Sequence, residues 1–287
     1  MEWERAKTYI LIFFVVLNIG LGFLIFMENR RYTVGTEQER QIRTVLNNNN
    51  ISMYTQLMRR FPPMRPLNVT GFYYDTDTLV EILFDNPQDV ERRVEFGRQT
   101  FRYGNSSMTI SNGFIFFENP DGFRQEMVFA QNSEITHAHA SLLTDEFIRS
   151  YFEDFVQDSH FEVRGGIRII YRQMYRGQLV HSNFIEFLVT PIGIEHIEMQ
   201  FGQILGHADT PLMIFSPDEA LITFVQRVSH MTQEAPMTIV HMDLVYFQEY
   251  ISDQPSVYHA VPFYRIFTRC SDDRPYLINA FTNVIID

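Results

Sequence analysis

Cysteine, lysine and tryptophan are nearly absent from this chain, which has one of each among 287 residues. The single Cys270 excludes an intrachain disulfide framework and a metal site built from several cysteines. No cysteine stands directly after the N-terminal apolar stretch, which excludes a lipoprotein anchor there. Lys7 is the only lysine, so arginine supplies 22 of the 23 basic residues. Arginine stays charged above the lysine pKa of ~10.4, so this bias fits an alkaline exterior as well as a habit of the lineage.

The motifs of common catalytic sites are also lacking: no G-x-S-x-G, H-E-x-x-H, phosphate-binding loop or dinucleotide-binding loop occurs. Cys270 precedes an expected turn, and no base is paired with it. His137 and His139 would share one face of an extended segment, but a catalytic zinc site needs a third protein ligand. The favoured interpretation is a pair of surface histidines. The sequence therefore predicts no enzyme, no catalytic residue, no cofactor and no metal.

Acidic residues outnumber basic ones, and the formal net charge is −12. Residues 1–31 carry a net charge of +1, which leaves −13 on residues 32–287. Contacts with nucleic-acid phosphates need clustered lysine and arginine. The acidic body therefore excludes nucleic acid as an expected partner.

Residues 8–27 form a long uncharged apolar run, enough for about 30 Å of helix. A signal peptide would have a shorter apolar region and a cleavage site between small residues, whereas Met27-Glu28-Asn29-Arg30-Arg31 follows here. We therefore expect an uncleaved single-pass anchor at 8–27, with a cytoplasmic tail at 1–7. Since seven residues make no domain, residues 32–287 form the functional body. An N-terminal signal-anchor most often leaves its short tail inside, so the body is expected outside the membrane.

Asn18 lies near the middle of this run, where lipid cannot satisfy its amide. Gly22 follows one helical turn later, so both share a face on which a partner helix could pack closely. The alternative is that a single asparagine is merely tolerated in a simple anchor. Asn18 and Gly22 are the candidate partner-helix contacts.

The body is expected to be α+β, with antiparallel β-meanders each covered by helices. A juxtamembrane helix and linker are predicted for 28–66, with a capping box from Thr36 to Glu39. A first β-rich domain is predicted for 67–135, and a C-terminal domain that repeats a helix and a meander for 140–287. Ser216 to Glu219 forms the capping box of the second of its helices, after a first helix at 144–156. The strands are expected at 71–74, 78–84, 94–103, 108–110, 114–117, 126–130, 167–175, 179–189, 193–201, 238–247, 261–267, 276–280 and 284–286.

Four arginines recur every four residues around the strand predicted at 167–175, which would place them on one side of a sheet. They could form a strip for an anionic wall polymer or an acidic partner. The favoured alternative is cross-strand pairing with carboxylates such as Glu186, Glu195 or Glu198. The strip consists of Arg164, Arg168, Arg172 and Arg176.

Two stretches resemble the YycI (WalI) family. The first is MEWERAKT at 1–8, followed by the apolar run with Leu17-Asn18; the second comprises AVPFYRI at 260–266 and YLINAFT at 276–282. In that family the C-terminal half resembles PepSY-type and YycH-type domains. The family's motif differs here at Tyr264, where tryptophan is common, and at Asn283-Val284, where Gly-Glu is common.

The resemblance implies a single-pass membrane protein of Gram-positive bacteria. Its expected partners are a YycH-like accessory protein and a YycG/WalK-like sensor histidine kinase, the kinase of a two-component system that controls cell-wall metabolism. In the family, the transmembrane helices carry much of the contact with the kinase. A helix can shift the kinase between states only by its difference in affinity for them.

Three functions are therefore considered. The first is a non-enzymatic, membrane-anchored regulator of the kinase that acts through helix and extracytoplasmic contacts. The second is an anchored extracytoplasmic module that binds a wall polymer or a peptide. The third and weakest is a membrane-tethered hydrolase with a histidine-bound metal.

Overall fold

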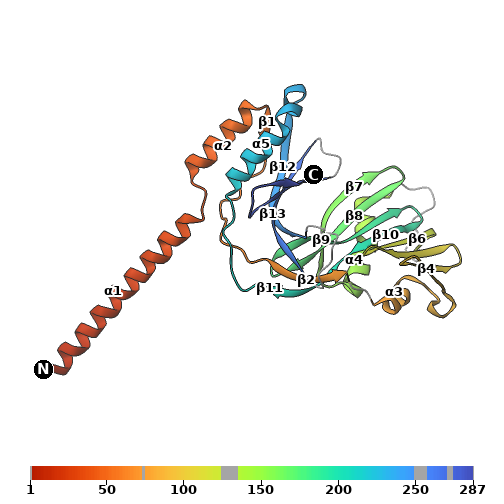
Figure 1. Ribbon diagram of the computed structural model, residues 1–287, viewed down its shortest axis with the longest axis horizontal. Helices are drawn as coiled ribbons and strands as arrows, with labels where there is room; N and C mark the ends of the chain where they lie inside the picture. The colour runs from red at the N-terminus through yellow and green to blue at the C-terminus, as the bar shows by residue number, and fades with distance from the viewer. Residues whose placement is uncertain (1, 73–74, 124–134, 249–256, 270–273, 287) are drawn as a thin grey trace. The chain divides into compact units, whose positions relative to one another are not determined.

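The computed structural model describes residues 2–72, 75–123, 135–248, 257–269 and 274–286 (Figure 1). It has the predicted mixed α+β class, with an apolar N-terminal helix and a large antiparallel sheet. Contacts divide the chain into two compact units. Unit 1 comprises Met1–Met64, Leu212–Asp243 and Tyr264–Asp287, and unit 2 comprises Arg65–Pro211 and Leu244–Phe263.

The N-terminal helix of unit 1, α1, runs over Glu2–Arg31. Its segment Lys7–Leu24 has a mean hydropathy of 2.0, and no part of it is buried in the protein. The helix is therefore long and apolar enough to cross a membrane. Near its start, the ammonium of Lys7 lies 5.3 Å from the ring centre of Trp3.

Helix α2 spans Thr36–Asn48, and its cap differs from the prediction by one residue. Gly35 is the N-cap, and the side-chain oxygen of Gln38 accepts its backbone N–H at 2.8 Å. Glu39, the expected capping residue, instead pairs with Arg43 and Arg59. Because the helix begins one residue earlier than predicted, Gln38 rather than Glu39 stands three residues after the N-cap.

The rest of unit 1 consists of helix α5 and short strand pairings. The capping box of α5 is confirmed: the Glu219 carboxylate accepts the Ser216 backbone N–H at 2.8 Å. The helix contacts α2, β14 and β15, while β1 pairs in parallel with β12. The bounds are Pro217–Glu234 for α5, Ile51–Met53 for β1, Met237–Phe247 for β12, Val257–Thr268 for β13, Tyr276–Asn279 for β14 and Ile285–Ile286 for β15. Strands β12 and β13 contribute residues to both units.

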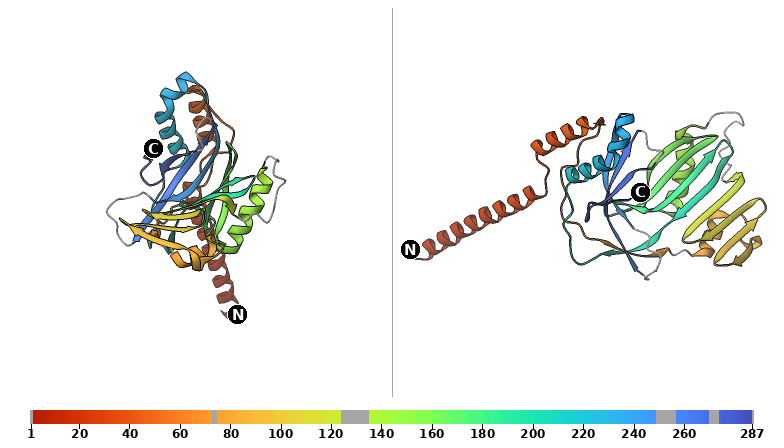
Figure 2. Two further views of the ribbon diagram at one scale, coloured as in Figure 1. Left: turned by 90° about the vertical axis from the view of Figure 1, so that its right-hand side faces the viewer. Right: turned by 45° about the horizontal axis from the view of Figure 1, so that its top comes forward.

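Unit 2 contains an antiparallel sheet in the order β7-β8-β9-β10-β6-β5-β4-β3 (Figures 1 and 2). A second ladder joins β2 to β11 and β13. The bounds are Leu67–Phe72 for β2, Glu91–Glu95 for β3, Arg98–Tyr103 for β4, Ser106–Ser111 for β5, Phe114–Phe123 for β6, Phe155–Val163 for β7, Gly166–Tyr175 for β8, Gln178–Thr190 for β9, Gly193–Gln200 for β10 and Gly202–His207 for β11. Helices α3 and α4 cover Thr76–Leu83 and His137–Tyr151, and a 3-10 turn covers Pro87–Asp89.

Three sequence predictions fail in unit 2, and one lies outside the described residues. The strand predicted at 78–84 is helix α3, because its buried Leu79, Val80 and Leu83 have helical spacing. The strand predicted at 94–103 is the β3–β4 hairpin, which turns at two residues. The helix predicted at 144–156 begins earlier, at His137, and ends before β7. The strand predicted at 126–130 falls outside the described residues.

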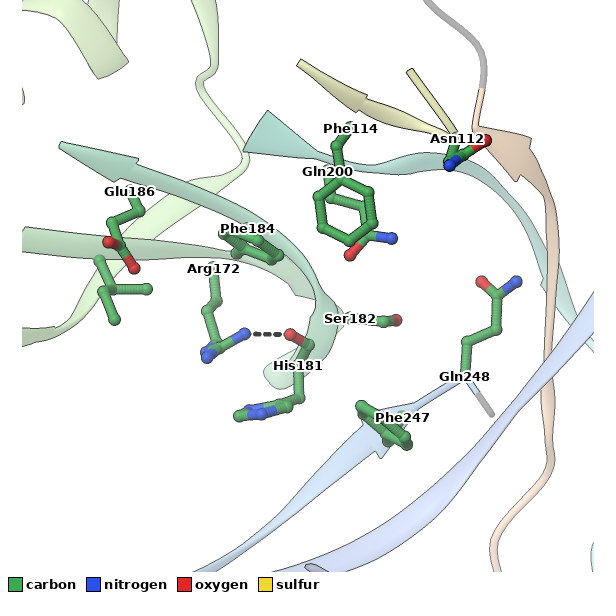
Figure 3. A pocket seen from close by; sticks show the side chains of 11 residues that line it. Asn112, Phe114, Arg172, His181, Ser182, Phe184, Glu186, Gln200, Phe247 and Gln248 are labelled. Carbon is green, nitrogen blue, oxygen red and sulfur yellow. Dashed lines mark hydrogen bonds between the residues drawn. The ribbon is translucent and has the colours of Figure 1, made fainter. Parts of the chain in front are cut away.

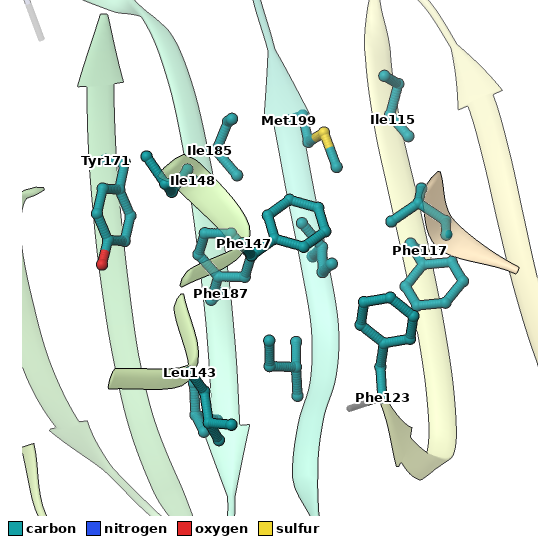
Figure 4. Close-up of a cluster of buried hydrophobic side chains, with 14 of the residues drawn as sticks. Ile115, Phe117, Phe123, Leu143, Phe147, Ile148, Tyr171, Ile185, Phe187 and Met199 are labelled. Carbon is teal, nitrogen blue, oxygen red and sulfur yellow. The ribbon is translucent and has the colours of Figure 1, made fainter. Parts of the chain in front are cut away.

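One face of the unit 2 sheet carries the hydrophobic core together with residues of α3 and α4 (Figure 4). Phe147 of α4 packs edge-on against Phe187 of β9, with 5.4 Å between the ring centres. Thr144 of α4 hydrogen-bonds the hydroxyl of Tyr171 at 2.8 Å. Burial raises the pKa of Tyr171, so this hydroxyl stays protonated. Because strand side chains alternate, the polar residues of these strands lie on the opposite face.

Candidate functional site

The strands of unit 2 place polar and aromatic side chains in rows on the face opposite the core. We call this surface the polar face. Its central row follows from the strand registers, which set residues directly opposite one another from β8 to β3. The row is Ile170, Glu186, Glu198, Phe116, Thr109, Thr100 and Arg93.

The pairing register of strand β9 shifts at His181, Ser182 and Asn183, a bulged segment that we call the β9 gap. On one side β8 pairs Arg172 with Phe184, and its next residue, Gln173, already pairs with Val180. On the other side β10 pairs with β9 from Phe184 onward, while β12 pairs at Val180. Within the described part of the chain, the registers of β8, β10 and β12 with β9 therefore skip the same three residues. Bulges of this kind bend a strand and are common beside functional sites.

Arg172 holds one side of the β9 gap. Its guanidinium donates a hydrogen bond to the backbone carbonyl of His181. It also pairs with the Asp158 carboxylate at 3.0 Å and lies 5.8 Å from the ring centre of Phe184. The side chains of Arg172 and Asp158 are both mostly buried, so each charge needs the other as its counter-charge. The arginine is thus committed to the scaffold of the site.

On the other side of the β9 gap, Asn183 fixes the backbone through its side chain. Its side-chain amide donates to Gln173 at 2.6 Å and to the carbonyl of Gly202 at 3.1 Å. A side chain at position 202 would place its Cβ 2.4 Å from the carbonyl oxygen of Thr70, so only glycine permits this approach of β11 to β2. The gap is therefore held in a defined conformation.

A hollow of about 530 Å³ opens on the polar face at the β9 gap (Figure 3). Three phenylalanine rings and several neutral polar side chains form its wall. Ser182 of β9, Gln200 at the end of β10 and Gln248 just after β12 point into one space. The lining residues are Asn112, Phe114, Ile170, Arg172, His181, Ser182, Phe184, Glu186, Gln200, Phe247 and Gln248.

Two polar atoms of this wall are buried without a hydrogen-bond partner among the described residues. They are the hydroxyl oxygen of Ser182 and the side-chain carbonyl oxygen of Gln248. Their residues are only 9% and 6% exposed. A buried polar group that lacks a partner costs about 1–3 kcal/mol. Such groups beside a hollow are typical of a ligand site.

A smaller hollow of about 220 Å³ lies around Glu198 on the same face. Arg168 pairs with Glu186 at 3.0 Å, while Glu198 faces Glu186 directly across the ladder. Burial and the neighbouring Glu186 raise the pKa of Glu198. Among the described residues, no group of three histidine, cysteine or acidic side chains is placed to hold a metal ion.

The four arginines of the predicted strip lie in two kinds of position, two on a strand and two in turns. Arg168 and Arg172 lie on β8 and pair with carboxylates, Arg168 with Glu186, one of the expected partners. Arg164 and Arg176 lie in the turns that flank β8. Arg176 contacts the ring of Tyr175 at 5.4 Å.

The other candidate residues lie on helices or outside the described residues. Asn18 donates from its amide nitrogen to the carbonyl of Phe14 at 2.8 Å, which leaves its amide oxygen available to a neighbouring helix. A Cβ at Gly22 would meet nothing within 4 Å. His137 and His139 belong to the first turn of α4 rather than to an extended segment. Cys270 falls outside the described residues.

Sequence reasoning missed Ser182, Gln200 and Gln248, because neutral side chains belong to no catalytic motif. One signal was present. The polar run His181-Ser182-Asn183 interrupts an otherwise apolar strand, and such a break in alternation indicates a bulge.

Comparison with known proteins gives similarity of fold only. No family model matches the chain, and no curated protein matches it. An uncharacterized protein from Eubacterium rectale aligns with a TM-score of 0.52 at 10% identity, over 83% of this chain and 89% of the other. The Bacillus megaterium YpeB C-terminal domain aligns with a TM-score of 0.41 at 10% identity, over 76% of this chain and 98% of the other. The YycI resemblance stays a prediction.

Proposed function

We propose that this chain is a single-pass, membrane-anchored regulator without enzymatic activity. Its apolar helix contacts the transmembrane helix of a YycG/WalK-like sensor kinase, and its body acts outside the membrane with a YycH-like accessory protein. The observation that carries the proposal is α1, whose segment Lys7–Leu24 is apolar and exposed along its whole length. The resemblance of residues 1–8, 260–266 and 276–282 to the YycI family supports the identity of the partners.

The contact face of α1 is assigned to Asn18 and Gly22. The amide oxygen of Asn18 can accept a hydrogen bond from a neighbouring helix, and the open space at Gly22 lets that helix approach closely. Gly20 lies about 160–200° around the helix from both residues, given ~100° per residue. It therefore marks the opposite face of the same helix.

Replacing residues 8–27 with an unrelated apolar anchor is expected to abolish co-purification with the kinase and the effect on kinase autophosphorylation. Within the native helix, Asn18→Leu is expected to weaken association about 3- to 30-fold, since one interhelical hydrogen bond contributes ~0.6–2 kcal/mol. Gly22→Leu should have a similar effect through steric exclusion. Both are measured by pull-down from membranes at matched expression.

Gly20→Leu is the matched control, because it adds the same side chain on the opposite face. It should leave co-purification unchanged. Kinase association that survives the anchor replacement would show that the helix is not the contact.

A second candidate function is an anchored module that binds a ligand outside the membrane. The hollow at the β9 gap supports it, because its wall contains buried polar atoms that have no hydrogen-bond partner among the described residues. The third function, a membrane-tethered hydrolase with a histidine-bound metal, has no supporting geometry among the described residues.

A further inference from the structure

We propose that the surface of unit 1 at the end of α1 lies against the headgroups of anionic lipids, in the same membrane that α1 crosses. Three segments form this surface, which we call the juxtamembrane surface: residues 30–32, 59–61 and 213–215. The inference rests on the proposed function in one respect, because α1 must cross the membrane. It adds a second attachment, which the body makes to lipid without the kinase.

The segment 59–61 is held beside the end of α1 by backbone hydrogen bonds. Phe61 donates its N–H to the carbonyl of Tyr32 at 3.0 Å, and Val34 donates its N–H to the carbonyl of Arg59 at 2.8 Å. The rings of Tyr32 and Phe61 meet edge-on, with 6.4 Å between their centres. Because Tyr32 directly follows the last residue of α1, the segment 59–61 lies where this helix ends.

The segment 213–215 reaches the same place from a distant part of the chain. Met64 and Leu212 exchange two backbone hydrogen bonds, at 2.8 and 2.9 Å, in an antiparallel bridge. The two segments that meet in such a bridge run in opposite directions. Residues 213–215 therefore lead from Met64 back toward Phe61.

The segment 213–215 exposes two large apolar side chains on a fixed backbone. Met213 and Phe215 are 60% and 39% exposed, whereas Ile214 between them is 5% exposed, as alternation along an extended segment requires. The backbone N–H of Phe215 donates to the carbonyl of Ala280 at 2.8 Å, and its carbonyl accepts the hydroxyl of Tyr264 at 2.6 Å. Apolar side chains that are held outward in this way fit an apolar environment outside the protein.

Basic charge gathers at the juxtamembrane surface of an otherwise acidic chain. Residues 30–60 contain six arginines and two glutamates, a net charge of +4, whereas the whole chain has a net charge of −12. Arg31 and Arg60 are exposed, and neither has an ion-pair partner among the described residues. Arginines at the end of a membrane helix are attracted to anionic headgroups.

The position of this surface selects lipid, rather than a protein, as its partner. The apolar run ends at Met27, and Tyr32 follows five residues later, which is about 7 Å further along the helix at ~1.5 Å per residue. The headgroup layer on each side of the hydrocarbon core is about 5–8 Å thick. The juxtamembrane surface thus begins at the depth of the headgroups, where aromatic and basic side chains are favoured.

The test uses the full chain reconstituted alone in lipid vesicles, with one tryptophan as the reporter. Trp3→Phe removes the native indole, and Phe215→Trp then adds a reporter on the juxtamembrane surface. Because Phe215 is far from α1 in sequence, only the folded surface brings it to the lipid. Lipid brominated in the upper part of its acyl chains is expected to quench the reporter at least about twofold, since an interfacial side chain reaches this depth.

Two further variants in the Trp3→Phe background complete the measurement. Phe61→Trp repeats it on the neighbouring segment, so that the test does not depend on a single variant. Phe96→Trp is the matched control, because it is the same substitution at a fully exposed position of unit 2. The control is expected to escape quenching.

Vesicles of phosphatidylcholine with and without phosphatidylglycerol test the role of the arginines. Quenching of the reporter at position 215 is expected to be stronger with phosphatidylglycerol. Arg31→Gln and Arg60→Gln should each reduce the lipid-contacting fraction about fivefold in these vesicles, and ~1 M salt should act in the same direction. Arg98→Gln and Arg102→Gln, which remove exposed arginines of unit 2, are the matched controls and should change nothing.

Insertion of α1 is measured separately, by resistance to alkaline extraction. Inserted protein whose reporter at position 215 or 61 escapes quenching would overturn the juxtamembrane contact and leave the proposed function standing. Equal quenching at position 96, or equal quenching with and without phosphatidylglycerol, would also overturn the contact with anionic lipid. Protein that fails to insert would overturn the proposed function and this inference together.

Discussion

Arg265 is one of the most deeply buried charged residues of unit 1, with 2% of its surface exposed. Its guanidinium forms two hydrogen bonds to Asp243, at 2.9 and 2.6 Å. The His241 ring nitrogen lies 3.5 Å from the same carboxylate. Burial pushes the pKa of Asp243 upward, but the hydrogen bonds from Arg265 and His241 outweigh it and hold that pKa below its ordinary value. The ionised pair therefore stabilises the fold.

Asp243→Asn is expected to destabilise the protein by about 3 kcal/mol at pH 7, because it removes the negative charge that accepts two hydrogen bonds from the buried guanidinium. A folded pKa below the unfolded one gives a stabilisation that is present above the ordinary Asp pKa of 3.8 and is lost as pH falls through the folded value. The difference between wild type and variant should therefore shrink in acid. Urea unfolding at pH 7 and near pH 3 measures both effects.

Asp209→Asn is the control for this change, because Asp209 is exposed. It should alter stability by less than about 0.5 kcal/mol. A pH-independent difference between wild type and Asp243→Asn would contradict the ion-pair explanation.

At this scale the sequence predicted the chemistry of single residues better than their partners. It predicted cross-strand pairing of the four arginines with carboxylates such as Glu186, and Arg168 does pair with Glu186, since β8 and β9 are neighbours in sequence. The partner of Arg265 is 22 residues away, and no spacing rule connects them. Burial of Ser182 and Gln248 likewise depends on strands that meet only in the folded chain.

Among the elements, the β3–β4 hairpin has an unusual turn. Phe96 and Gly97 both have positive φ, at 49° and 77°. Turns of this type prefer asparagine followed by glycine, as at Asn112-Gly113 in the β5–β6 hairpin. Phe96 is fully exposed, so it gains no packing that would offset the unfavourable backbone conformation.

Phe96→Asn is expected to stabilise the protein by about 0.5–1 kcal/mol, since asparagine tolerates the left-handed conformation. Asn112→Phe, the reverse change in the equivalent turn, should destabilise by a similar amount. Thermal unfolding of the two variants beside wild type checks the pair. A loss of stability in Phe96→Asn would mean that the exposed ring makes contacts that the turn geometry does not reveal.

Elements with strong local signals were predicted well, and those decided by tertiary packing were not. The Ser216–Glu219 capping box located the start of α5, because capping depends on residues a few positions apart. Helix α3 was mistaken for a strand, since its apolar residues fit both periods over a short length. The hairpin at Phe96 was missed because phenylalanine is not a turn residue.

For the whole molecule, the two compact units are each assembled from distant parts of the chain. The predicted boundaries at 67–135 and 140–287 follow chain order, because composition and turn signals carry no information about distant contacts. Strand β1, from the predicted juxtamembrane segment, pairs with β12. Strand β2, from the predicted first domain, pairs with β11 and β13.

A fragment of residues 140–287 is therefore expected to lack cooperative unfolding, because β1, β2 and α2 are missing from it. Residues 32–287, which retain these elements, should unfold cooperatively. Circular dichroism during thermal unfolding compares the two. A sharp transition in the shorter fragment would show that the C-terminal stretch folds independently of the early strands.

The pair of Trp3 and Lys7 at the start of α1 makes this protein unusually easy to label and to observe. Apart from the α-amino group, Lys7 is the only primary amine in the chain, so amine-reactive dyes attach within the first turns of α1 and spare the body. Trp3 is likewise the only indole, so tryptophan fluorescence arises entirely from the same place. A dye on Lys7 and the emission of Trp3 thus report on the apolar-helix end of the molecule alone, without any engineered probe.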